Sequence, residues 1–245
     1  MTLPTVYWPL WALLAGTFPA PDGRAIIAAM HDRYAGKWYA TLTFVQHNTA
    51  TRPDDSTEHS TWHEYAALPG RLRIDFEPLD SAGGVLFARD SQFVFRGGHL
   101  ASATAFVHPL MVLGFDVYFD STGRTARRLE QLGFDLATVH EDTWDGRPAY
   151  VVGARAGDLR TRQFWVDKER LLFVRLLEPG QRDTARTSDI RFNDYRPVGP
   201  AWVSAEVAFL VDGRQRWLEQ YAEIRTGTSL PDALFDPRRW SAQRP

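Results

Sequence analysis

Residues 68–98 read LPGRLRIDFEPLDSAGGVLFARDSQFVFRGG and contain three short strands with hardly any connection between them. In the first strand Leu72, Ile74 and Phe76 alternate with charged residues, a period of two that is typical of a half-buried strand. Turns rich in Gly, Asp and Ser lead into residues 85–88 and then 93–95, and Gly97-Gly98 ends the run. The stretch predicts a β-meander with one heavily apolar face, which another part of the chain must cover.

Strand patterns continue on both sides of this meander. Asp145-Gly146 and Asp212-Gly213 are hairpin signals. Consecutive hairpins predict one antiparallel sheet of about ten or more strands, and a sheet of that size curls strongly. No linker or repeat divides the pattern, so we expect residues 21–245 to form one domain. The further strands are predicted at residues 38–49, 57–67, 136–141, 147–156, 162–166, 171–178, 187–195, 202–210 and 214–225.

Three helices are expected, which makes the fold class α+β. Asp22 is a suitable N-cap for a first helix that ends at Gly36. A second helix begins at Pro109 and is apolar at almost every position from Leu110 to Phe119, so it must be covered on all sides. A third, basic helix occupies residues 122–133. The sheet should wrap around these helices, and a short helical turn at residues 230–237 should close one end of the sheet.

Composition limits the function classes. A net charge of −2 and a pI near 6.4 argue against a nucleic-acid-binding protein, which is usually basic. The chain has no cysteine, which excludes disulfides, thiolate metal sites, cysteine nucleophiles and a lipidated N-terminal cysteine. Residues 7–18 are apolar and have the length of a signal-peptide core, although no Lys or Arg precedes them. Residues 1–20 are either a secretion signal, which we favour, or an apolar segment that packs on the domain.

Common catalytic motifs are missing: the chain has no GxSxG elbow, P-loop, GxGxxG or HExxH. His59 and His63 lie four apart on a predicted strand, which places them on one face but too far apart for good metal geometry. Glu58 and Glu64 flank them, yet we expect no metal site, no cofactor and no catalytic residues. A hydrolase built on the His and Asp residues is the least favoured interpretation.

Three polar residues near the apolar helix have open roles. Asp116 is the most unusual charge in the chain, because it lies within that helix. In a structural role, Asp116 would form a salt bridge or lie on an exposed face of the helix. In a functional role, it would contact the head group of a ligand or latch the helix to the sheet. His99 and His108 flank the helix, and we expect them to cap it or to lie at the surface.

The order of several weak motifs resembles the LolA/LolB-like lipoprotein-carrier superfamily, especially its predicted outer-membrane lipoprotein-sorting branch. The similarity extends from about residue 25 to residue 237. It rests on Phe44-Val45-Gln46, Pro69 to Ile74, Phe164 to Asp167, Phe192 to Tyr195 and Leu234-Phe235-Asp236.

This resemblance implies an unclosed half-barrel whose concave face is capped by helices, with an apolar cavity between them. It also implies binding of acyl chains rather than catalysis. Two features depart from the family pattern. Leu68 stands where the carrier proper has an arginine that helps to hold its lid shut, and the lipidated cysteine of the receptor branch is missing. The cargo, a lipid or lipoprotein acyl chain, is therefore left unassigned.

We expect the cavity to lie between the concave sheet face and the helix at residues 110–119. Strand parity and the apolar helix together predict its lining. The predicted ligand-binding residues are Leu42, Phe44, Leu72, Ile74, Phe93, Phe95, Leu110, Leu113 and Val117.

Residues 109–133 are expected to form a mobile cover over this cavity. Arg124, Arg127 and Arg128 should point outward, toward anionic lipid head groups or an acidic partner. The alternative is a permanent structural plug.

The leading functional hypothesis is non-catalytic binding and transport of an acyl chain by a periplasmic monomer. The alternative is a periplasmic sensory or regulatory domain of the same fold that binds a membrane-associated protein partner. No nucleic-acid partner is expected under either hypothesis.

Overall fold

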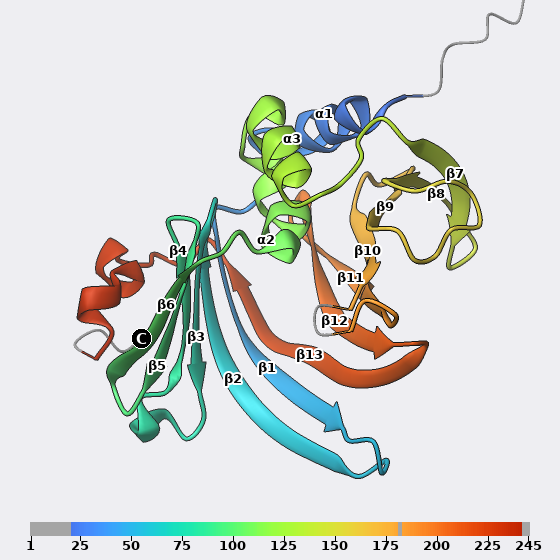
Figure 1. Cartoon of the computed structure of the whole chain (residues 1–245). Coiled ribbons are helices and arrows are strands. Elements are labelled where there is room, and N and C mark those ends of the chain that lie inside the picture. Colours follow the sequence, from blue (N-terminus) through green and yellow to red (C-terminus); the bar gives the residue numbers. More distant parts are fainter. Residues whose placement is uncertain (1–20, 181–182, 242–245) are drawn as a thin grey trace, which may run out of the picture.

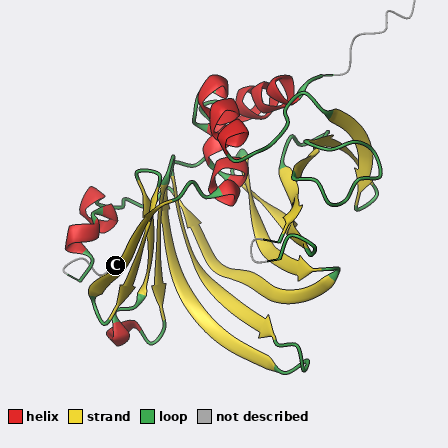
Figure 2. Ribbon diagram, viewed as in Figure 1, coloured by secondary structure: helices red, strands yellow, loops and turns green. Residues whose placement is uncertain are grey.

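The protein forms one large antiparallel sheet with helices across one end, as the computed structural model shows for residues 21–180 and 183–241 (Figure 1). The sheet has 13 strands, and its order ends at two different edge strands, so it is not closed. This architecture confirms the predicted α+β half-barrel (Figure 2). The expected signal segment, residues 1–20, lies outside the described residues.

The first half of the chain is a helix followed by a meander. Its elements are α1 (Gly23–Tyr34), β1 (Thr41–Thr51), β2 (Thr57–Ala67), β3 (Arg71–Phe76), the 3-10 turn η1 (Leu79–Ser81), β4 (Gly84–Ala88), β5 (Ser91–Arg96) and β6 (His99–Ala105).

The second half begins with the helical segment and returns as another meander. Its elements are α2 (Pro109–Gly114), the 3-10 turn η2 (Asp116–Tyr118), α3 (Thr122–Gln131), β7 (Val139–Trp144), β8 (Arg147–Val152), β9 (Gln163–Asp167), β10 (Phe173–Pro179), β11 (Thr187–Val198), β12 (Ala201–Val211), β13 (Arg214–Thr226), η3 (Asp232–Phe235) and η4 (Pro237–Arg239).

The strand order explains where the helices lie. It runs β6-β5-β4-β3-β2-β1-β13-β12-β11-β10-β9-β8-β7, so the two meanders meet at the β1–β13 pair. The helical segment joins β6 to β7, which are the two edges of the sheet. It must therefore cross from one edge to the other, and it lies with α1 across one end of the trough that the curled sheet forms (Figure 1).

Local sequence signals account for the first helix. The Asp22 side chain accepts a hydrogen bond of 2.8 Å from the backbone N–H of Ala25 and so caps α1. The apolar stripe Ile26, Met30 and Tyr34 is buried in the main core beside the concave face of the sheet. Among the described residues, none of the helices is both long and apolar enough to cross a membrane.

Two of the predicted boundaries that differ from the structure concern the meander and the helical segment. Gly97 and Gly98 have φ values of 55° and 79° and form a tight hairpin into β6, so they do not end the meander. The apolar helix predicted to run to Phe119 instead breaks at Phe115, whose φ is −137°. The break turns Asp116 toward hydrogen-bonding partners, which a buried carboxylate requires.

The C-terminal segment does not close the end of the sheet as expected. It packs on the sheet face opposite the cavity, over β3 to β5, where Leu234, Phe235 and Trp240 meet Leu86 and Phe95. The charged face of β3 is therefore covered rather than solvated. Arg73 is only 1% exposed. Its guanidinium lies 4.0 Å from the centre of the Trp240 ring and forms two hydrogen bonds to Asp75.

Candidate functional site: an apolar cavity with an acidic floor

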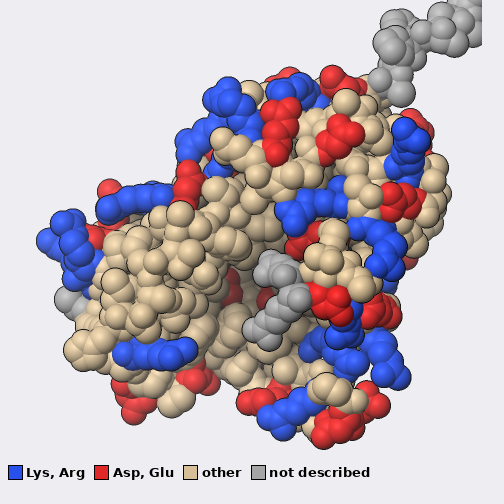
Figure 3. Space-filling model, viewed as in Figure 1, with Lys and Arg blue, Asp and Glu red and all other residues tan. Residues whose placement is uncertain are grey.

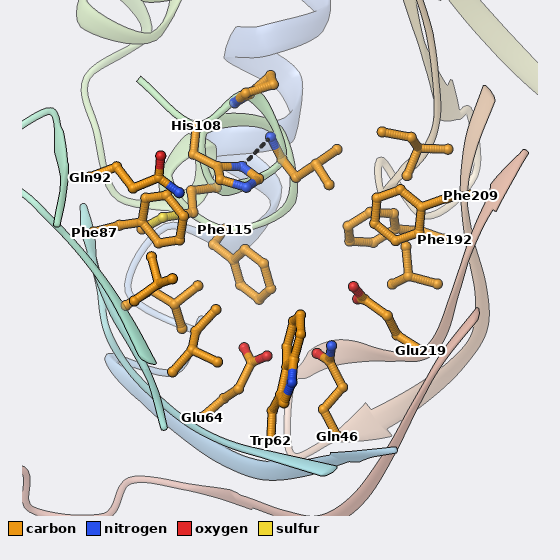
Figure 4. A pocket seen from close by; sticks show the side chains of 18 of the residues that line it. Gln46, Trp62, Glu64, Phe87, Gln92, His108, Phe115, Phe192, Phe209 and Glu219 are labelled. Atoms are coloured by element: carbon orange, nitrogen blue, oxygen red, sulfur yellow. Dashed lines mark hydrogen bonds between the residues drawn. The ribbon is translucent and has the colours of Figure 1, made fainter. Parts of the chain in front are cut away.

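A cavity of about 680 Å³ lies between the concave face of the sheet and the helical segment. The strands β1 to β5 form one side, β10 to β13 form the other, and residues 106–115 lie across the top (Figure 4). In the space-filling view the molecule is hollowed between the two halves of the sheet, and acidic atoms are visible inside the hollow (Figure 3).

The walls of the cavity are mainly apolar. Alternation along each strand places every second side chain on this face. The aliphatic and aromatic lining is Leu42, Phe44, Trp62, Ala66, Leu68, Leu72, Ile74, Phe76, Val85, Phe87, Phe106, Leu110, Met111, Phe115, Ile190, Phe192, Val207, Phe209, Val211 and Tyr221.

The structure brings together part of the predicted lining. Leu42, Phe44, Leu72, Ile74 and Leu110 all border the cavity. The predicted residues Leu113 and Val117 do not. They are fully buried in the main core, among the side chains through which the helices and the sheet pack together. Leu68 is part of the cavity wall.

Phe93 and Phe95 lie on the opposite face from the one predicted. Phe93 pairs with Leu86, and Phe95 stacks on Trp240 with ring centroids 4.2 Å apart. It is their neighbour Gln92 that borders the cavity. The parity rule was misapplied because it assumed one covered face, whereas the C-terminal segment covers the other face of β5 as well.

Four polar or amphipathic side chains form the floor of the cavity. None of the four was among the lining residues predicted from the sequence. They are Gln46 from β1, Trp62 and Glu64 from β2, and Glu219 from β13 (Figure 4). A signal was present for Glu64, since it alternates with Trp62 and Ala66 along one strand. The position of Glu219 on the same floor follows only from the β1–β13 pairing.

Burial makes both floor carboxyls hard to ionise. The pKa of Glu64 is raised well above its ordinary value, first by burial and then by the charge of Glu219. The pKa of Glu219 is raised to about 7 by burial, although hydrogen bonds to its carboxylate act in the opposite direction. Trp217 Nε1 donates to Glu219 at 3.1 Å, and the Tyr221 hydroxyl donates at 2.8 Å.

His108 borders the cavity from above and caps α2. Its Nδ1 accepts a hydrogen bond of 3.2 Å from the backbone N–H of Leu110, so the proton of the neutral ring is on Nε2. Burial lowers the pKa of His108 to about 4. The capping role expected for this histidine is therefore confirmed, and the residue is neutral at pH 7.

Buried charges tie the helical segment to the sheet. Asp116 accepts a hydrogen bond of 2.8 Å from the backbone N–H of Gly70, which precedes β3. Asp116 Oδ2 also lies 3.1 Å from Arg128, whose guanidinium contacts Asp120 at 3.2 Å and Asp90 in the turn between β4 and β5. Burial raises the pKa of Asp116 to about 6.

These contacts decide two of the open questions. Asp116 forms both a salt bridge and a latch between the helical segment and the sheet. The prediction that Arg128 points outward was wrong, because three carboxylates draw its side chain into the structure. Arg124 and Arg127 are exposed as predicted.

The histidines of β2 do not join the floor carboxyls. His59 contacts Thr49 at 3.2 Å, and His63 contacts Glu77 at 2.9 Å, whereas Glu64 points into the cavity. Within residues 21–180 and 183–241, no group of three or more His, Asp or Glu side chains is placed to hold a metal ion.

Comparison with known proteins identifies the fold but no sequence family. No family model matches the chain, and no curated protein matches it. Among solved structures, the putative outer membrane lipoprotein-sorting protein domain from Vibrio parahaemolyticus is 11% identical, with a TM-score of 0.61 over 89% of this chain and 97% of that chain.

Two further solved structures are similar. The DUF1329 family protein from Desulfovibrio piger is 14% identical, with a TM-score of 0.58 over 87% of this chain and 95% of that chain. A LolA superfamily protein from Nitrosomonas europaea is 12% identical, with a TM-score of 0.55 over 89% of this chain and 98% of that chain. The unclosed half-barrel, its helical cap and these likenesses together show that the chain has a LolA-like fold.

Proposed function

We propose that the protein binds a lipid or lipoprotein acyl chain in the cavity between its sheet and helices, and carries it in the periplasm without catalysis. The single observation that carries this proposal is the cavity of about 680 Å³ with mainly apolar walls. Its volume lies in the range of about 300–1,000 Å³ that is typical of ligand pockets.

The energetics favour an apolar chain. Each methylene that leaves water for the cavity contributes ~0.8 kcal/mol, so one long acyl chain offers about 10 kcal/mol before the cost of association. Aromatic rings such as Phe44, Phe115 and Phe209 border the space from several sides. These side chains supply contact area, and none of them is a nucleophile or a general base.

The fold likeness supports the same assignment. One similar structure carries a lipoprotein-sorting description, and another is assigned to the LolA superfamily. We infer the periplasmic location and the transport role from this likeness and from the expected secretion signal. The cover formed by residues 109–133 is the element that we expect to move when a chain enters.

Native mass spectrometry of the purified protein, before and after delipidation, tests the proposal. We expect mass additions of lipid size before delipidation, and their loss afterwards. The delipidated protein should then bind a neutral environment-sensitive hydrophobic dye while folded, and a long-chain alcohol should displace the dye. Folded protein that neither carries lipid nor binds the dye would contradict the proposal.

A further inference from the structure

Glu64 is a buried carboxyl group without a hydrogen-bond donor among the described residues. The residue is 5% exposed, and its side chain points into the cavity from the floor (Figure 4). Burial and the nearby charge of Glu219 are the influences on its ionisation, and no hydrogen bond from the described chain opposes them. Burial favours the protonated form of this group, and a cation from a ligand in the cavity would favour the carboxylate instead.

Glu219 provides a second, oriented carboxyl group on the same floor. Trp217 Nε1 holds its Oε1, and the Tyr221 hydroxyl holds its Oε2. Gln46, on β1, lies between the two glutamates (Figure 4). Its side-chain amide donates to Asn48 at 2.6 Å rather than to Glu64. The floor therefore presents two carboxyl groups to the same cavity.

The described lining supplies no cation to these acceptors. Its two basic side chains are His108, which burial keeps neutral, and Arg186, which is paired with Asp212 at 2.8 Å. The remaining polar contact surface at the floor is the indole of Trp62, which stands beside Glu64 (Figure 4). An aromatic face next to carboxylates is a combination that suits an ammonium group, through charge and cation–π attraction.

We infer that the cavity selects an amphiphile whose apolar chain bears a protonated amine, which Glu64 and Glu219 bind as carboxylates beside the Trp62 ring. This inference rests on the proposed function and adds a preference for the charge of the ligand. A free fatty acid is disfavoured relative to the amine, because its carboxylate would meet two acidic groups in a poorly solvated space. An uncharged alcohol of the same length satisfies one acceptor but brings no positive charge.

Competition against a neutral hydrophobic dye at neutral pH tests this preference with dodecylamine, dodecanol and dodecanoate. We expect dodecylamine to displace the dye at about tenfold lower concentration than dodecanol, since a hydrogen bond to a charged group is worth that much. Dodecanoate should be the weakest competitor. Glu64→Gln and Glu219→Gln keep the side-chain shape, and each should reduce the preference for the amine while leaving displacement by dodecanol unchanged.

Glu58→Gln is the matched control, because Glu58 lies on the same strand but is exposed and paired with Arg52. It should retain the full preference. Equal displacement by dodecylamine and dodecanol, or a preference that survives in the double variant Glu64→Gln/Glu219→Gln, would overturn the inference while leaving the proposed function intact. A wild-type protein that binds neither the dye nor dodecanol would instead overturn the proposed function, and this inference with it.

Discussion

Arg128 Nη1 lies 3.1 Å from Asp116 Oδ2, and this buried ion pair joins α3 to the 3-10 turn η2. Each partner also reaches the sheet, since Arg128 pairs with Asp90 and Asp116 accepts from the Gly70 N–H. The helical segment is thus fastened to two separate turns of the sheet. Leu68, two residues before Gly70, makes no ion pair with the helical segment. The contacts that hold the segment to the sheet are those of Asp116 and Arg128.

Asp90→Asn should loosen this latch without removing the buried pair. Asp90 is half exposed, so its contact with Arg128 is a modest one. We expect amide hydrogen exchange in residues 109–133 and release of a bound hydrophobic dye to become about twofold to fivefold faster. Asp145→Asn is the control, because Asp145 occupies a similar left-handed turn position, with φ of 48° against 53° for Asp90. Unchanged exchange in Asp90→Asn, or equal protection with and without ligand, would identify a fixed plug instead of a mobile cover.

Arg128→Met should destabilise the protein strongly. The substitution leaves Asp116 buried without its cation, and Asp120 keeps only its contact of 3.4 Å with Arg124. We expect the free energy of unfolding in urea to fall by about 3–5 kcal/mol. Arg127→Met, on the exposed side of the same helix, should change it by less than about 0.5 kcal/mol. Similar losses for the two variants would mean that the buried ion pairs contribute little.

Substitution of the two arginines of β3 should also change the free energy of unfolding by different amounts. Arg73 is fully buried between Asp75 and the Trp240 ring, whereas Arg71 is partly exposed and paired with Asp232. Arg73→Ala should lower the free energy of unfolding by about 3–5 kcal/mol, because Asp75 loses its bidentate partner. Arg71→Ala should lower it by less than about 1 kcal/mol. Thermal unfolding followed by tryptophan fluorescence measures both, and equal shifts would mean that the buried pair of Arg73 and Asp75 contributes no more than the exposed pair of Arg71 and Asp232.

Ionisation of Glu219 should make the ligand-free protein less stable as the pH rises. Its pKa is about 7 in the folded protein against an ordinary value of 4.5, so the stability it contributes is complete below 4.5 and is lost as the pH rises through about 7. Glu64, Tyr221, Trp217 and Gln46 face this carboxyl group and are unchanged in Glu219→Gln. Between about pH 5 and about pH 8, urea unfolding should show the variant gaining about 2–3 kcal/mol relative to the wild type. Parallel pH profiles would exclude a titrating Glu219.

Val85→Trp should fill part of the cavity and weaken binding of the neutral dye. Val85 is partly exposed on β4 and borders the cavity, so an indole at this position can enter the empty space. We expect dye affinity to fall by about tenfold, because the apolar contact area available to the dye is reduced. Leu100→Trp is the control, since Leu100 on the edge strand β6 is 53% exposed and is not part of the lining. Unchanged dye binding in Val85→Trp would place the dye elsewhere.

Much of the fold was predictable because its elements are encoded locally. The alternation of Leu72, Ile74 and Phe76 predicted a strand and its apolar face, and that face borders the cavity. Asp145-Gly146 and Asp212-Gly213 form the predicted hairpins, with positive φ at both residues of each pair. Such signals depend on neighbouring residues alone, so a chain of consecutive hairpins is visible before the tertiary structure is known.

The sequence by itself determined the strands, their turns, the N-cap of α1 and the alternating sides of each strand. Only the tertiary structure decided which side of β5 faces the cavity, that Arg128 is buried, and that Glu64 and Glu219 share one floor. The physical reason is that a period of two says which residues share a face but not what covers that face. The cover comes from chain segments far away in sequence, and the two glutamates are brought together by strands from the two ends of the chain that pair with β1.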